Sequence, residues 1–117
     1  MSIPIIKVSP KFFKWFLAEW VSGIALFPYI LIKNEKYLQD FKLINHETIH
    51  IRQQIETLIV IFYLWYGIEY LIRWILTGSR MEAYQNISFE REAYANQHDK
   101  NYLQNRPFWA HLRWLRI

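Results

Sequence analysis

The chain begins with two short apolar stretches separated by a mixed segment. The first, IPIIKVS, is rich in β-branched residues and ends at Ser9-Pro10, a pattern typical of a strand. Ser9 can cap a following helix with Pro10 at its first position, and Phe12 to Trp20 are predicted to form that helix. The second stretch, GIALFPYILI, contains Pro28, which predicts an edge strand because proline cannot donate a hydrogen bond within a sheet.

A long segment with helical features follows, and it predicts helix from His46 to about Leu76. Proline is absent from this range and Gly67 is its one glycine, so we expect one helix, or two joined near Gly67. Gly78 suits the end of a helix. The middle, TLIVIFYLWYGI, is apolar on all sides, which requires either burial in the domain or contact with lipid. Its length falls short of the roughly 20 residues of a transmembrane helix, so a membrane span is the less favoured alternative.

Two shorter helices and an aromatic tail are expected after this segment. The SRME sequence that starts at Ser79 has the form of a capping box, and Ser88 can cap a second helix that carries FEREAYANQHDKNYLQ. Pro107 then begins an amphipathic piece, FWAHLRWLRI, which either closes the core or lies on a membrane interface. We therefore expect a mainly helical α+β fold with a small antiparallel sheet near the N-terminus, in a single domain over 1–117.

Composition and charge narrow the functional classes. Of the 117 residues, 53% are hydrophobic and 19% aromatic, which leaves aromatic surface for a membrane, a partner subunit or a substrate groove. The net charge of +4 comes from scattered basic residues without a recognised nucleic-acid module, so no nucleic-acid partner is expected. Without cysteine, any metal must be held by histidine and carboxylate groups. The N-terminal segment lacks the unbroken apolar run of a signal peptide, which predicts a cytoplasmic protein, with a membrane surface as a further partner.

The segment NHETIHIRQQ places two histidines four residues apart on the predicted long helix. Residues at this spacing share a helix face, so His46 and His50 can offer two imidazoles to one metal ion. Glu47 lies beside such a metal, where proteins with His-Glu-x-x-His use the glutamate to activate a zinc-bound water. Gln53 and Gln54 are candidates for an orienting hydrogen bond to His50. The alternative is a pair of surface histidines without a metal.

A catalytic zinc typically keeps three protein ligands, and FEREAYANQH is the candidate segment for the third. Glu90 and Glu92 are two residues apart, which directs them to nearly opposite faces of a helix, so only one can reach the metal. Glu92 shares its face with Phe89, Ala93 and Asn96, a mixture of apolar, small and polar residues. This face favours Glu92 as the ligand, with Glu90 as the alternative.

HETIH followed by EAYAN resembles the gluzincin class of zinc metallopeptidases, in which His-Glu-x-x-His precedes a helix with a third-ligand glutamate. The arrangement is most similar to members with Glu-x-x-Ala-Asp or Glu-x-x-Ala-Asn, among them prenyl-protein proteases, membrane heat-shock proteases and repressor-cleaving antitoxin-type proteases. The chain is also similar to small minimal-zincin-like proteins that share both segments. The resemblance implies a zincin-like domain whose active-site helix packs on the second, Glu-bearing helix. It implies Zn²⁺ held by His46, His50 and Glu92, with Glu47 as general base and Asn96 as a support.

Two further expectations concern the substrate. The family often has a strand before the zinc helix that binds an extended substrate, and GIALFPYILI is in the right place for that strand. A residue that stabilises the transition state is not evident from the sequence, and Tyr94, His98 and His111 are the candidates.

The favoured function is a zinc-dependent metallopeptidase that hydrolyses peptide bonds in a peptide or protein substrate. The alternative is a non-enzymatic helical protein that associates with a membrane or a partner and carries a structural or vestigial zinc site. An open coordination position that faces a cleft would favour the enzyme, because structural zinc sites are usually closed by four protein ligands. The sequence indicates no particular oligomeric state.

Overall fold

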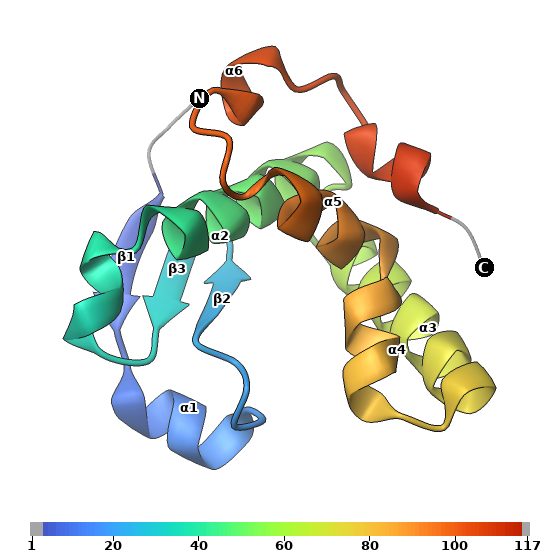
Figure 1. The fold of residues 1–117 in the computed structure, drawn as a ribbon, viewed down its shortest axis with the longest axis horizontal. Coiled ribbons are helices and arrows are strands. Elements are labelled where there is room, and N and C mark those ends of the chain that lie inside the picture. The colour runs from blue at the N-terminus through green and yellow to red at the C-terminus, as the bar shows by residue number, and fades with distance from the viewer. Residues whose placement is uncertain (1–3, 116–117) are drawn as a thin grey trace.

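The computed structural model describes residues 4–115 (Figure 1). In chain order, the elements are β1 (Ile5–Val8), α1 (Pro10–Phe16), β2 (Gly23–Leu26), β3 (Tyr29–Ile32), the 3-10 helix η1 (Glu35–Gln39), α2 (Phe41–Glu56), α3 (Val60–Thr77), α4 (Arg80–Asn86), α5 (Ser88–Asn96), α6 (Tyr102–Asn105) and the 3-10 helix η2 (Ala110–Trp114). The strands and the packed pair of α3 and α4 lie at opposite sides of the molecule, with α2 and α5 between them. The expectation of a mainly helical α+β fold is confirmed.

The sheet has the strand order β1-β3-β2 and differs from the expected antiparallel sheet. Strand β1 pairs with β3 in parallel, whereas β2 pairs with β3 in antiparallel orientation. The segment GIALFPYILI was expected to be one strand, but it forms the β2–β3 hairpin with the cis Phe27–Pro28 peptide in the turn. The single-strand prediction is therefore wrong. Strand β2 forms the edge of the sheet beside the helices, and Pro28 lies outside it in the turn.

The long segment from His46 to Leu76 is divided between α2 and α3, and the break is not at Gly67. The chain turns at Leu58 and Ile59, which adopt positive φ angles of 59° and 60°. Gly67 lies inside α3, where a side chain added to it would meet nothing within 4 Å. The turn was not predictable from glycine or proline because non-glycine residues make it. Helix α1 is also shorter than expected and ends at Phe16.

Helix α2 is fixed to the sheet by apolar packing and by one amide side chain. Ile51 of α2 is buried with Ala25, Ile30 and Ile32 of the hairpin. The side chain of Gln54 accepts a hydrogen bond from the backbone N–H of Phe27 at 2.8 Å and donates to the backbone oxygen of Ala25 at 2.7 Å. Gln54 therefore occupies backbone groups at the C-terminal end of β2 and in the turn that follows it.

Glycine at the start of β2 allows that strand to approach α2 closely. A Cβ atom at Gly23 would lie 3.2 Å from a methyl carbon of Leu43 and 3.3 Å from Cγ of Glu47. Both distances are tighter than an ordinary van der Waals contact, so a larger residue would push the strand away from Glu47.

Local signals at the helix ends were confirmed in part. Gly78 ends α3 with a φ of 70°, and the Ser79 side chain accepts a hydrogen bond from the N–H of Glu82 at the start of α4. Ser88 was expected to cap α5 but lies within its first turn. Its N–H and its hydroxyl both donate to the carboxylate of Glu69, at 2.9 and 2.5 Å. A buried side chain of α3 therefore supplies the cap that a local serine was expected to provide.

The C-terminal segment closes the core. His111 and Ala110 of η2 are buried, and the His111 ring packs on Phe89 and Trp65.

Helix α3 is mostly exposed, since only 17% of it is buried. Helix α3 is long and apolar enough to cross a membrane, a property that it shares with some core helices of soluble proteins. Burial within the domain therefore does not account for the apolar composition of α3.

Candidate metal centre

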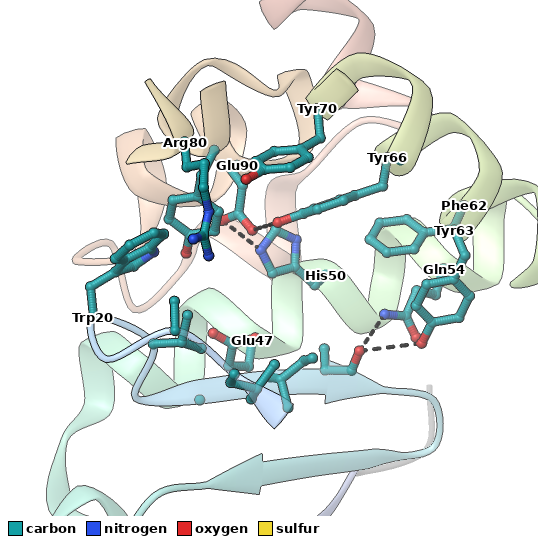
Figure 2. Close-up of a pocket in the computed structure, with 18 residues that line it drawn as sticks. Trp20, Glu47, His50, Gln54, Phe62, Tyr63, Tyr66, Tyr70, Arg80 and Glu90 are labelled. Carbon is teal, nitrogen blue, oxygen red and sulfur yellow. Dashed lines mark hydrogen bonds and ion pairs between the residues drawn. The ribbon is translucent and has the colours of Figure 1, made fainter. Parts of the chain in front are cut away.

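Helices α2 and α5 bring His46, His50 and Glu90 together in the interior. The Nε2 atoms of the two histidines are 3.2 Å apart, and they lie 2.9 and 3.0 Å from Oε1 of Glu90. Each of the three residues is at most 4% exposed. Figure 2 shows His50 and Glu90 pointing toward one another beside a pocket. The spacing of four residues therefore does place both imidazoles on one side of α2, as predicted.

The three ligand atoms are spaced as a tetrahedral metal site requires. Zinc binds nitrogen and oxygen at about 2.0 to 2.1 Å, which puts neighbouring ligand atoms of a tetrahedron about 3.3 Å apart. The observed separations of 2.9, 3.0 and 3.2 Å are within a few tenths of this value. Two imidazole nitrogens and a carboxylate oxygen that face one another in the interior need a cation between them, either a proton or a metal ion. His46, His50 and Glu90 could thus hold a metal ion.

Amide side chains orient both imidazoles. Nδ1 of His50 is 2.7 Å from the side-chain oxygen of Gln53, and Nδ1 of His46 is 2.8 Å from that of Gln97. Because an amide oxygen only accepts, each Nδ1 carries the hydrogen and each Nε2 is directed at Glu90. Gln53 was among the predicted orienting residues. Gln97 was missed, although its position seven residues after Glu90 is a signal that it lies on the same side of the helix.

Glu90 is itself held by a tyrosine from a third helix. The hydroxyl of Tyr66 on α3 donates to Oε2 of Glu90 at 2.5 Å, which leaves Oε1 for the histidines. Sequence analysis missed Tyr66 because its approach depends on the turn between α2 and α3. No local sequence pattern indicates that turn.

Glu92, the favoured ligand, is placed elsewhere by the structure. It accepts hydrogen bonds from Gln53 at 2.9 Å, from the hydroxyl of Tyr102 at 2.6 Å and from Nε of Arg106 at 2.5 Å. Arg106 also donates to Glu56 on α2. The preference for Glu92 is therefore corrected in favour of Glu90, which was the alternative. Glu92 still touches the site, because the amide of Gln53 connects it to His50.

The reason for this correction is the packing of α5, which is buried on more than one face. Phe89 and Ala93 are both fully buried, and the Phe89 ring packs against Phe62 of α3. Phe89, the large apolar neighbour of Glu92, therefore faces the aromatic core. A mixed apolar face was a poor guide in a helix where Glu90 and Glu92 are both buried.

The other predicted site residues lie at different distances from the histidines. Asn96 donates to the backbone oxygen of Glu92 on its own helix, and Gln54 binds the hairpin, so neither has the supporting contact expected of it. The ring of Tyr94 lies 4.4 Å from that of His46, centroid to centroid. His98 is exposed, and His111 is enclosed by aromatic side chains. Of these five residues, Tyr94 alone contacts a site histidine.

Glu47 lies between two cavities that reach the site. It lines a cavity of about 340 Å³ together with His50 and Glu90, and a second of about 250 Å³ together with His46. The walls of the larger cavity are mainly apolar and aromatic, as Figure 2 shows for Phe62 and Tyr66. The Glu47 carboxylate therefore lies where a bound molecule would meet the three ligand atoms.

Burial and mutual attraction set the charges in the site. Burial raises the pKa of Glu47, and the nearby His46 and His50 offset this only in part. Burial alone would lower the pKa of His50, but the attraction of the Glu90 carboxylate outweighs it and raises that pKa to about 9. The same histidines hold the pKa of Glu90 well below its usual range, against the effect of burial. In the protein without metal at neutral pH, a proton on His50 therefore lies beside Glu90.

In comparisons with known proteins, no family model, curated protein or solved structure matches the chain. The geometry itself gives a buried group of two histidines and one glutamate, on α2 and α5, that could hold a metal ion.

Replacing Arg106 by methionine should destabilise the protein by about 3 to 5 kcal/mol, because the buried Glu92 would lose its cation. Arg113→Met, at an exposed arginine, is the matched control and should change stability by less than about 0.5 kcal/mol. Urea unfolding followed by circular dichroism measures both. Equal stability of the two variants would contradict the role assigned to the pair of Arg106 and Glu92.

The metal-free protein should lose stability as the pH rises from about 6.5 to about 9. The folded-state pKa of His50 exceeds its ordinary value of 6.5, so its proton stabilises the fold fully below pH 6.5, and the contribution disappears by about pH 9. The loss is on the order of 3 kcal/mol. Urea unfolding in the presence of a chelator measures it. His50→Gln should remove the decline and His98→Gln should keep it, whereas stability that is constant over this range would contradict the assignment.

Proposed function

We propose that this protein is a zinc-dependent metallopeptidase. One observation carries the proposal: three ligand atoms converge beside the buried Glu47 at the wall of a cavity. Two imidazoles and one carboxylate are a ligand set that catalytic zinc uses when it keeps a further position open for water or substrate. The donor set and the spacing of its atoms fit zinc.

The chain supplies a distinct role for each residue of the site. His46, His50 and Glu90 would hold the ion, with Gln97, Gln53 and Tyr66 fixing their orientation. When bound, zinc polarises a carbonyl group and lowers the pKa of water. The Glu47 carboxylate would take a proton from the attacking water and deliver it to the leaving amine. In the metal-free protein, burial raises the pKa of Glu47, and a bound cation would act in the opposite direction.

The β2 edge supports an extended peptide as substrate. Gly23, Ile24 and Ala25 line the larger cavity together with Glu47 and His50, so a peptide paired with this edge would pass the proposed metal. Gln54 occupies the backbone oxygen of Ala25, which leaves the part of the edge around Gly23 for pairing. The aromatic cavity walls favour apolar side chains in the substrate.

Tyrosine hydroxyls support the transition-state role better than histidine does. Tyr94 contacts His46, and its hydroxyl lies 3.0 Å from that of Tyr84, which lines both cavities. His98, the second candidate from the sequence, lines neither of the two cavities. We therefore assign the stabilising role to Tyr94 with Tyr84.

The protein should bind about one zinc ion per chain, because three ligand atoms are already arranged for it. Elemental analysis after zinc loading and gel filtration measures the content. His46→Ala and Glu90→Ala should lose the metal, while His98→Ala, at an exposed histidine, should retain it. A wild-type protein that stays metal-free in the presence of zinc would rule out the site. Zinc lost on Glu92→Gln but kept on Glu90→Ala would restore Glu92 as the ligand.

Glu47→Gln should retain zinc and lose peptide hydrolysis by a factor of about 10² to 10⁴, because the amide cannot accept the proton. Mass spectrometry of products from a peptide mixture measures the rate, with Glu82→Gln on the exposed face of α4 as the matched control. Hydrolysis that is unchanged in Glu47→Gln would remove Glu47 as the base. A zinc-loaded wild type without any turnover would favour the non-enzymatic alternative.

A further inference from the structure

Helix α3 has its ionisable residues inside and its apolar residues outside, the reverse of a helix on a water-exposed surface. Glu69 and Arg73 are buried at 8% and 7% exposure. Much of the remaining circumference of the helix exposes large apolar side chains, each between 49% and 74% accessible: Leu64, Ile68, Leu71, Ile72, Ile75 and Leu76. We call these six residues the outer face of α3.

The buried charge of α3 has a structural use within the molecule. The Glu69 carboxylate accepts both the N–H and the hydroxyl of Ser88 at the start of α5. In helices that contact lipid, ionisable side chains face the protein interior in this way, because a charge in hydrocarbon is costly. The distribution of charge along α3 therefore matches an environment of lipid better than one of water.

The width of the exposed apolar surface distinguishes lipid from a single partner helix. At about 100° per residue, the exposed positions of α3 extend over roughly 200° of its circumference. A packed helix contacts a narrower stripe, commonly about 100° wide. A second copy of this chain that docked through one helix would leave much of this exposed arc in water. Lipid chains adapt to the whole arc.

A second exposed element, α1, adds aromatic and basic groups. Trp15 and Phe16 are 72% and 74% exposed, and the ammonium group of the neighbouring Lys14 lies 5.8 Å from the Trp15 ring. Lys11 on the same helix is also exposed. Tryptophan rings and lysines are typical of the boundary between hydrocarbon and headgroups, where positive charge attracts anionic lipids. This positive charge complements a membrane surface that carries anionic headgroups.

Both apolar elements border the larger cavity. Leu17 and Ala18, directly after α1, form one wall, and Tyr66 and Tyr70 of α3 form another. Figure 1 shows α1 and the end of α3 on the same lower side of the molecule. A membrane that contacts both elements would therefore lie near the entrance to the site.

We propose that the outer face of α3 docks on an anionic lipid bilayer, with Trp15 and Phe16 entering the headgroup region. The outer face occupies the hydrocarbon boundary, and Lys11 and Lys14 lie among the headgroups. Docking depends on α3 and α1 alone, so it stands independently of zinc binding and hydrolysis.

Flotation of the full chain with vesicles of phosphatidylcholine and phosphatidylglycerol tests this docking. The wild type should float with the vesicles and bind pure phosphatidylcholine more weakly. A variant with Ile68→Glu, Leu71→Glu and Ile75→Glu should bind at least about tenfold less, because it places three charges against lipid. These positions are exposed, so the variant should keep its circular dichroism spectrum and its zinc content.

The matched control carries the same added charge at exposed positions outside α3 and α1. It combines Gln39→Glu, Gln104→Glu and Asn105→Glu and should bind vesicles as the wild type does. A wild type recovered entirely apart from the vesicles would overturn the proposal, as would equal flotation of the α3 variant. If the wild type formed a soluble dimer that dissociates in the α3 variant, the outer face would bind a second copy of the chain instead of lipid. If the wild type floated with the vesicles but bound no zinc, the proposed function would be contradicted and the docking proposal would stand.

Discussion

Two imidazole nitrogens and one carboxylate oxygen face one another across 2.9 to 3.2 Å in the interior, and the rest of the structure depends on this arrangement. Without a cation between them, three electron-rich atoms at this distance would repel. In the metal-free protein, the proton on His50 meets this requirement, and it is reflected in the raised pKa of that residue. A metal ion would replace the proton in a geometry that the chain already provides.

A second layer of buried polar groups keeps these atoms in place. Gln53 contacts His50 through its oxygen and Glu92 through its nitrogen, and Arg106 then joins Glu92 to Glu56. The C-terminal half of α2 is thus connected to α5 and to Arg106, which follows α6. Because each of these buried charges has a partner, mutual attraction and hydrogen bonds offset the desolvation penalty of keeping the network in the interior.

Helix α3 connects the interior of the site to the surface of the molecule. Its inner face contributes Tyr66 to Glu90 and Glu69 to the start of α5. Its outer face is apolar and exposed. The same helix thus supports the ligands and presents the surface that we assign to lipid, because residues three or four positions apart share a helix face and the remaining residues point elsewhere.

Features set by neighbours along the chain were determined by the sequence. His46 and His50 share a face because a helix repeats after 3.6 residues, and Gly78 and Ser79 mark helix ends through local backbone chemistry. Only the tertiary structure decided between Glu90 and Glu92, since the rotation of α5 is set by its packing against α2, α4 and η2 and both carboxylates are buried. It also decided the contacts of Gln97 and Tyr66, because the turn between α2 and α3 arises at residues without glycine or proline. Spacing fixes which side chains share a face, and packing fixes what that face meets.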